Sequence, residues 1–201
     1  MASILKVDTI QDQSGNNIIN ENADTITIGA SGDTIAIPTG ATLTVPNGGL
    51  SGQNYPAFEA YLSANIVVTN NVTAKIPINT EVFDTNGYYD NATNYRFTPL
   101  VAGKYMVYAS AYGFALSANN LESVRASIYK NGSIYRTAYF GDTSDGGYTR
   151  TAFVQAIVDM NGSTDYLEAY ALVESISGVD PRLTSNSTDK ATYFGAYRIG
   201  D

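Results

Sequence analysis

The aromatic residues of this 201-residue chain are confined to one part of it. All 16 Tyr and all 7 Phe lie at position 55 or later, and the first 54 residues contain none. Aromatic side chains supply much of the apolar area that a small core buries. We therefore predict a boundary near Tyr55, where a segment that cannot build a substantial core alone gives way to a domain with its own core.

Composition excludes several kinds of chemistry. The chain contains no Cys, His or Trp, so it has no disulfide, no thiolate nucleophile and no catalytic or metal-binding imidazole. Its net charge is −8, from 19 acidic and 11 basic residues, which opposes binding to a phosphate backbone. We expect no catalytic residue, no cofactor, no metal site and no nucleic-acid partner.

The N-terminal sequence predicts neither export nor membrane insertion. No basic stretch precedes a long apolar run, as a secretory signal requires, and no apolar run is long enough to cross a bilayer. We expect the chain to be made and assembled in the cytoplasm.

A short motif recurs three times after residue 23, as DTITIGASG, DTIAIPTG and ATLTVPNG. Each copy is a β-rich run closed by a turn sequence. Units this small gain stability by stacking on neighbours, within the chain or from other chains. We predict that residues 23–54 form an extended β stalk shared by three copies, the alternative being a flexible linker. The predicted stalk core is Ile26, Ile28, Ile35, Ile37, Leu43 and Val45.

Residues 1–22 precede the repeats and are interpreted as an anchoring segment. Its apolar residues could form a strand that docks on another protein by β-addition. The equally weighted alternative is a strand that caps the stalk itself. The anchoring residues are Ile4, Leu5, Val7 and Ile10.

Residues 55–201 show the alternation of an all-β domain. Apolar side chains recur at every second position in the runs 105–112, 124–129 and 152–158. We predict three further strands at residues 134–140, 166–173 and 192–199. The dipeptide Asn131-Gly132 separates two of these runs and predicts a tight hairpin. Several strands are apolar on both faces, so we expect one face to pack inside a sandwich and the other to meet a partner molecule.

The order of landmarks resembles the complement-one-q and tumour-necrosis-factor-like jelly roll. The landmarks are PAFEA (56–60), KIPINTEVFDTNGYYD (75–90), YRFTPLVAGKYMVYAS (95–110), SIYKNGS (127–133) and YFGAYRI (193–199). Residues 160–165 depart from the family, which often has a Gly-Asp pair there. The resemblance implies a ten-stranded jelly-roll knob that assembles as a homotrimer and binds rather than catalyses.

The opening Ser3–Gln11, with the Gly-Asn stretch and Thr-Ile-x-Ile repeats that follow, resembles the start of fibre and appendage proteins of tailed bacteriophages. This resemblance implies a virion protein, docked through its N-terminus on another virion structural protein. The function we expect is attachment of the C-terminal knob to a glycan or protein on the host surface. A capsid decoration protein or head fibre is the alternative, and a polysaccharide-degrading tailspike is a further one.

Candidate receptor-binding residues cluster in the acidic loop near residues 141–148, where carboxylates and aromatic rings suit sugar recognition. The alternatives are a cation site and a solvated turn with no binding role. They are Tyr139, Asp142, Asp145, Tyr148 and Arg150.

Two other acidic patterns are interpreted as structural. Asp84 and Asp90 resemble part of a calcium loop but lack its full set of oxygen ligands. Calcium near the apex of a trimer stays an open alternative. Glu168 and Glu174 could be the carboxylate pair of a glycosidase, although we expect a solvated strand face.

Overall fold

The computed structural model describes residues 9–11, 13–15, 17–22, 25–29, 32–42, 55–141 and 146–200. The chain divides into two compact units, residues 1–50 and 51–201. The described residues contain strands, turns and irregular segments but no helix, and hence no helix that could cross a membrane. The predicted all-β class is confirmed.

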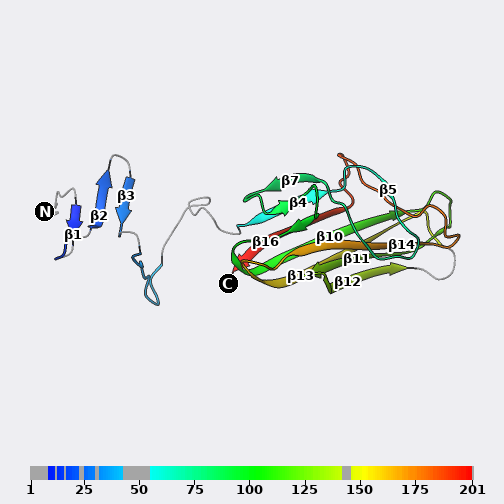
Figure 1. Cartoon of the computed structure of the whole chain (residues 1–201). Helices are drawn as coiled ribbons and strands as arrows, with labels where there is room; N and C mark the ends of the chain where they lie inside the picture. The colour runs from blue at the N-terminus through cyan, green and yellow to red at the C-terminus, as the bar shows by residue number, and fades with distance from the viewer. Residues whose placement is uncertain are drawn as a thin grey trace. The chain divides into compact units, whose positions relative to one another are not determined.

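The N-terminal unit contains one antiparallel sheet of three strands (Figure 1). β2 (Asn17–Asn22) lies in the middle, between β1 (Thr9–Gln11) and β3 (Thr25–Ile28). This N-terminal sheet joins the predicted anchoring segment to the first repeat. The second repeat falls in residues 32–42, which form no strand in the single chain.

The C-terminal unit is a sandwich of two antiparallel sheets. The first, called the β10 sheet, centres on β10 (Ala102–Phe114). β13 (Thr149–Asn161) pairs with β10 on one side, and β16 (Tyr193–Gly200) pairs with it on the other. β4 (Ala57–Tyr61) follows β16, and β7 (Thr80–Asp84) follows β4. Two short strands extend the sheet beyond the end of β16: β15 (Arg182–Leu183) and β5 (Ile66–Val67).

The second sheet, called the β11 sheet, runs in the order β12, β11, β14, β9, β8. Its long strands are β12 (Ser133–Gly141), β11 (Leu121–Lys130) and β14 (Leu167–Ser175). Three two-residue strands complete it: β6 (Ala74–Lys75), β8 (Tyr89–Asp90) and β9 (Arg96–Phe97). The described part of this unit thus has eight strands of five or more residues and five short ones, where the resemblance implied ten.

The core lies between the two sheets and is built by period-two alternation. Tyr105, Val107 and Ala109 of β10 are fully buried, as are Val124 and Ala126 of β11, because every second side chain of a strand faces the same way. Four aromatic rings pack together in this core. Phe58 stacks on Tyr89 and Phe97 at centroid distances of 4.5 and 4.4 Å, and Phe194 meets Phe58 edge-on at 5.1 Å.

The hairpin predicted at Asn131-Gly132 is present. Both residues have positive φ, 53° and 76°, and they join the paired strands β11 and β12. The Asn131 side chain also reaches the loop before β14, since its carbonyl oxygen accepts a hydrogen bond from the backbone N–H of Tyr166 at 2.9 Å. The turn is therefore held both by its own dihedral angles and by a neighbouring segment.

Candidate interaction surfaces

The outer face of the β10 sheet, which points away from the core, carries large apolar side chains. On β13 the inward residues are small, since Ala152, Val154 and Ala156 are at most 5% exposed. The outward residues of the same strand are larger, and Phe153 and Ile157 are 48% and 56% exposed. The strand is therefore apolar on both faces, and the unit covers only one of them.

Strand register continues this apolar surface across the sheet. Met106 of β10 is paired with Ile157 on one side and with Tyr197 of β16 on the other. A second row is formed in the same way by Phe153, Ser110 and Tyr193. Cross-strand partners point to the same face, so the two rows form one continuous patch. This patch is called the outer aromatic face, and its members are Met106, Tyr108, Phe153, Ile157, Tyr193 and Tyr197.

Tyr108 lies at the centre of the outer aromatic face. Its hydroxyl donates a hydrogen bond to Oε2 of Glu59 on β4 at 2.8 Å, and its ring lies over Gly195 of β16. Burial raises the pKa of the Tyr108 phenol, and the hydrogen bond to Glu59 and its charge raise it further. The phenol therefore stays protonated, and it joins three strands across the sheet.

This surface has the chemistry of a protein contact. It is rich in Tyr and Phe, and those residue types are enriched in the cores of protein interfaces. A shallow hollow at its margin is lined by Met106, Arg136, Gln155, Ala156 and Ile157. Among the described residues, no group of three or more acidic side chains lies close enough together to hold a metal ion.

The structure describes three of the five predicted receptor-binding residues. Tyr139 lies on the outer face of β12, where the Arg125 guanidinium stands over its ring at 5.2 Å. Tyr148 packs edge-on against Phe114 at 4.8 Å. Arg150 lies over the Phe140 ring at 5.4 Å, and its Nε donates to the Leu121 carbonyl at 3.2 Å. The other two members, Asp142 and Asp145, lie outside the described residues.

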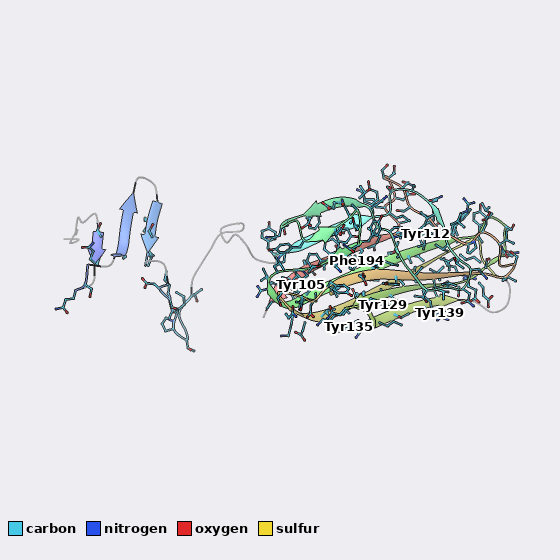
Figure 2. The ribbon with its side chains drawn as sticks, viewed as in Figure 1. Tyr105, Tyr112, Tyr129, Tyr135, Tyr139 and Phe194 are labelled. Atoms are coloured by element: carbon cyan, nitrogen blue, oxygen red, sulfur yellow. The ribbon has the colours of Figure 1, made fainter. Side chains whose placement is uncertain are left out.

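The outer face of the β11 sheet presents a second group of tyrosines. Tyr129 and Tyr170 stack with their centroids 3.8 Å apart. Beside them Ser127 and Thr137 share a hydrogen bond of 2.8 Å between their hydroxyls. Figure 2 shows Tyr129, Tyr135 and Tyr139 along the side of the sandwich that β11 and β12 form. Tyr139 is exposed, Tyr129 and Tyr170 are half-buried, and Ser127 is buried. This face therefore combines partly accessible rings with hydroxyl groups.

The two candidate acidic sites have structural roles in the folded chain. Asp84 accepts hydrogen bonds from the backbone N–H groups of Asn86, Gly87 and Tyr89. Asp90 accepts from the N–H groups of Ala92 and Thr93, and these bonds lower the pKa of its carboxyl to about 2. The carboxylate oxygens of both residues therefore hold their own turns.

Glu168 and Glu174 are not arranged as a glycosidase pair. They lie on the same face of one strand, β14, and a six-residue separation along a strand spans about 20 Å. The carboxyl groups of glycosidases are roughly 5 to 9.5 Å apart. Each has another partner, since Glu168 pairs with Lys75 and Glu174 accepts from the Ser123 hydroxyl.

The anchoring and stalk residues that the structure describes are exposed. Ile10 lies in β1 and is 40% exposed, and Ile26 and Ile28 of β3 are 67% and 54% exposed. Ile35 and Ile37 lie in residues 32–42 and are also exposed. The remaining predicted residues, Ile4, Leu5, Val7, Leu43 and Val45, lie outside the described residues.

Sequence reasoning missed Glu59 and Gly195, because a carboxylate and a glycine carry no signal of an aromatic surface. Their roles depend on β4 and β16 being neighbours of β10. The signal that was available is the second apolar row of β13, where Phe153 and Ile157 alternate with the core residues. That row predicted an exposed apolar face in general terms.

Comparison with known proteins identifies the fold class. No family model matches the chain, and no curated protein matches it. Among solved structures, the Eiger TNF of S. frugiperda superposes with a TM-score of 0.51 at 10% identity, covering 72% of this chain and 91% of that one. The globular domain of a zebrafish complement 1qA protein gives a TM-score of 0.47 at 13% identity, covering 72% and 96%. The C-terminal unit has the jelly-roll fold of tumour-necrosis-factor-like domains.

Proposed function

We propose that this chain is a homotrimeric virion protein of a tailed bacteriophage. Its C-terminal jelly roll would be a knob that attaches to the host surface, and its N-terminal unit would form the stalk and the connection to the particle. The observation that carries the trimer is the outer aromatic face. The phage context rests on the opening sequence and the Thr-Ile-x-Ile repeats.

The case for self-association is energetic. Burying apolar surface yields about 25 cal/mol per Å², and patches of several large apolar side chains on a soluble protein mark contact sites. Phe153, Ile157 and Tyr197 are 48%, 56% and 37% exposed and lie on the two strands that flank β10. A closed homotrimer covers such a face on every copy, which leaves none exposed.

Attachment to the host is assigned to the surfaces that the trimer would leave free. The outer face of the β11 sheet carries Tyr129, Tyr139 and Tyr170 together with the Ser127 and Thr137 hydroxyls. Rings flanked by hydrogen-bonding groups suit glycan recognition. Three copies in a knob, and many knobs on a particle, multiply weak contacts into strong attachment.

The trimer is tested by replacing Ile157 with Lys. Three buried ammonium groups at one interface cost roughly 2 kcal/mol or more per copy, so light scattering should report monomers for Ile157→Lys and trimers for the wild type. Val179, which is 63% exposed and lies outside the outer aromatic face, supplies the control Val179→Lys, which should remain trimeric. A monomeric wild type would refute the trimer.

The place on the particle is tested by electron microscopy with antibodies to the knob. Label on the tail supports host attachment, whereas label on the capsid shell supports a decoration protein. Release of oligosaccharide from host polysaccharide by the purified chain would overturn the assignment as a non-enzymatic protein.

A further inference from the structure

The N-terminal sheet carries a row of isoleucines that no described part of its own unit covers. Ile10 of β1 is paired with Ile19 of β2, and Ile19 is paired with Ile28 of β3. Because paired residues of neighbouring strands point to the same face, the three side chains form a line across all three strands. They are 40%, 38% and 54% exposed. This set is called the isoleucine row.

Further aliphatic surface adjoins the row. Ile26 is two residues from Ile28 on the same strand and is 67% exposed. The segment after β3 brings Ile35 next to Ile28, where the two help to line a shallow hollow with Asp33 and Thr34. Ile35 is itself 59% exposed, so this segment widens the apolar surface without covering it.

We infer that the isoleucine row is a contact surface between copies of this chain, so that the predicted anchoring strand β1 and the first repeat form one shared stalk. The inference rests on the proposed homotrimer. Three flat rows of identical side chains can meet about a common axis, and each then replaces water with aliphatic contacts.

The small size of the exposed area indicates that the isoleucine row is covered by other copies of this chain that are already joined through their knobs. The isoleucine row consists of three side chains that are 40%, 38% and 54% exposed, whereas a stable interface between free partners needs roughly 800 Å² and some 20 residues from each. The row is therefore too small to hold two untethered units. Copies joined through their knobs have an effective concentration on the order of millimolar, at which so small a contact suffices.

The net negative charge of the N-terminal unit also predicts that these units associate only when the copies are joined through their knobs. Residues 1–50 contain five acidic residues and one Lys, so separate units repel one another. The repulsion is screened by salt and is overcome when the copies are joined at the knob. The expected behaviour is association of the N-terminal units within a trimer that the knob has already formed.

The absence of cysteine from the chain permits a direct test on the full-length protein. In the variant Ile28→Cys, the introduced thiol lies in the isoleucine row. In the matched control Thr27→Cys it lies on the opposite face of β3, because adjacent residues of a strand point to opposite faces. Both variants are exposed to a mild oxidant and run on a denaturing gel.

We expect Ile28→Cys to form a disulfide-linked dimer, at one bond per trimer, and Thr27→Cys to remain largely unlinked. Equal cross-linking of the two variants, or none in Ile28→Cys, would overturn the inference. The thiol of Ile28→Cys could instead remain unlinked in the free trimer and become protected from oxidation only on the assembled particle. That result would show that the isoleucine row contacts another virion protein, and it would overturn the inference.

Light scattering of the same samples separates this inference from the proposed trimer. A trimeric mass without cross-linking of Ile28→Cys refutes the isoleucine contact and leaves the knob trimer standing. A monomeric mass refutes both. The triple variant Ile10→Thr, Ile19→Thr and Ile28→Thr, which keeps β-branched residues in the strands, should stay trimeric and lose protection of the N-terminal unit from protease.

Discussion

Gly195 shows how one residue depends on a contact from another strand. A Cβ added at this position would lie 2.4 Å from Cζ of Tyr108, so the tyrosine ring occupies the space that any other side chain would fill. The ring in turn brings the Tyr108 hydroxyl to Glu59. The Phe-Gly pair of the closing strand is therefore explained by packing on the outer face of the sheet.

We predict that Gly195→Ala destabilises the protein by about 1–3 kcal/mol, the range for overpacking a tight site. The measurement is chemical denaturation of the purified protein. The double variant Gly195→Ala/Tyr108→Ala removes the ring that the methyl group meets, so the two substitutions should be strongly non-additive. Additive effects would contradict the contact.

Asp90 illustrates a carboxylate that holds a turn. Hydrogen bonds from the backbone N–H groups of Thr93 and Ala92 lower its pKa from 3.8 to about 2. Because the pKa is lower in the folded state than in the unfolded state, the stabilisation is complete above about pH 4. It is lost as the pH falls toward 2.

We predict that Asp90→Ala lowers the free energy of unfolding by about 1 kcal/mol at pH 7, after allowance for solvent screening of the carboxylate. This corresponds to a decrease in Tm of roughly 2–4 °C. The difference from the wild type should shrink between pH 4 and pH 2 in thermal melts. A difference that stays constant over that range would show that the carboxylate charge has no part in the effect.

At the scale of elements, two identical dipeptides have different roles. Asn131-Gly132 closes a hairpin within the β11 sheet. Asn161 is the last residue of β13 in the β10 sheet, and Gly162 is the first residue of the connection to β14 in the β11 sheet, so this dipeptide begins a crossing between sheets. There the Asn161 side-chain oxygen accepts hydrogen bonds from the backbone N–H groups of Ser163, Thr164 and Asp165.

Asp165 joins these two turns. It accepts hydrogen bonds from the Asn131 side chain at 2.7 Å and from the Asn161 backbone N–H at 3.0 Å, and it pairs with Lys130 at 2.9 Å. Burial alone would raise its pKa, but the bonds from Asn131 and Lys130 outweigh burial and lower it. The loop at residues 160–165, which departs from the family pattern, is thus anchored by a residue of its own.

We predict that Asp165→Ala costs about 2 kcal/mol, because it leaves donors of two turns without their charged acceptor. Asp159 supplies the control, since its side chain is 81% exposed and lies 3.6 Å from Lys104. Asp159→Ala should cost at most about 0.5 kcal/mol, as exposed ion pairs contribute little. Equal losses in urea denaturation would refute the bridging role of Asp165.

At the scale of the whole molecule, the proposed trimer links folding to association. A protein whose folded chains bind one another gains stability by mass action, so the Tm of the wild type should rise with protein concentration. The variant Ile157→Lys should melt at a lower temperature that does not depend on concentration. A wild-type Tm that is independent of concentration would contradict the trimer.

The sequence by itself determined six of the long strands, β10 to β14 and β16, and the Asn131-Gly132 hairpin. It also predicted a jelly roll through its order of landmarks. The strands and the hairpin depend on local physics, because alternation sets which side chains share a face and a turn needs only residues that tolerate its dihedral angles. The jelly roll was implied by the family resemblance. The prediction of an unpartnered apolar face likewise came from alternation on both sides of β13.

Tertiary structure alone decided which apolar row became the core. On β13 the smaller side chains, Ala152, Val154 and Ala156, face inward, and the larger Phe153 and Ile157 face outward, because the space opposite is already filled by the β11 sheet. It also decided that Tyr108 meets Gly195 and Glu59, and that Ile10, Ile19 and Ile28 align across three strands. The contacts of Tyr108 join strands that are distant in the chain, and the alignment of the isoleucines depends on the register of β1, β2 and β3; alternation alone specifies neither.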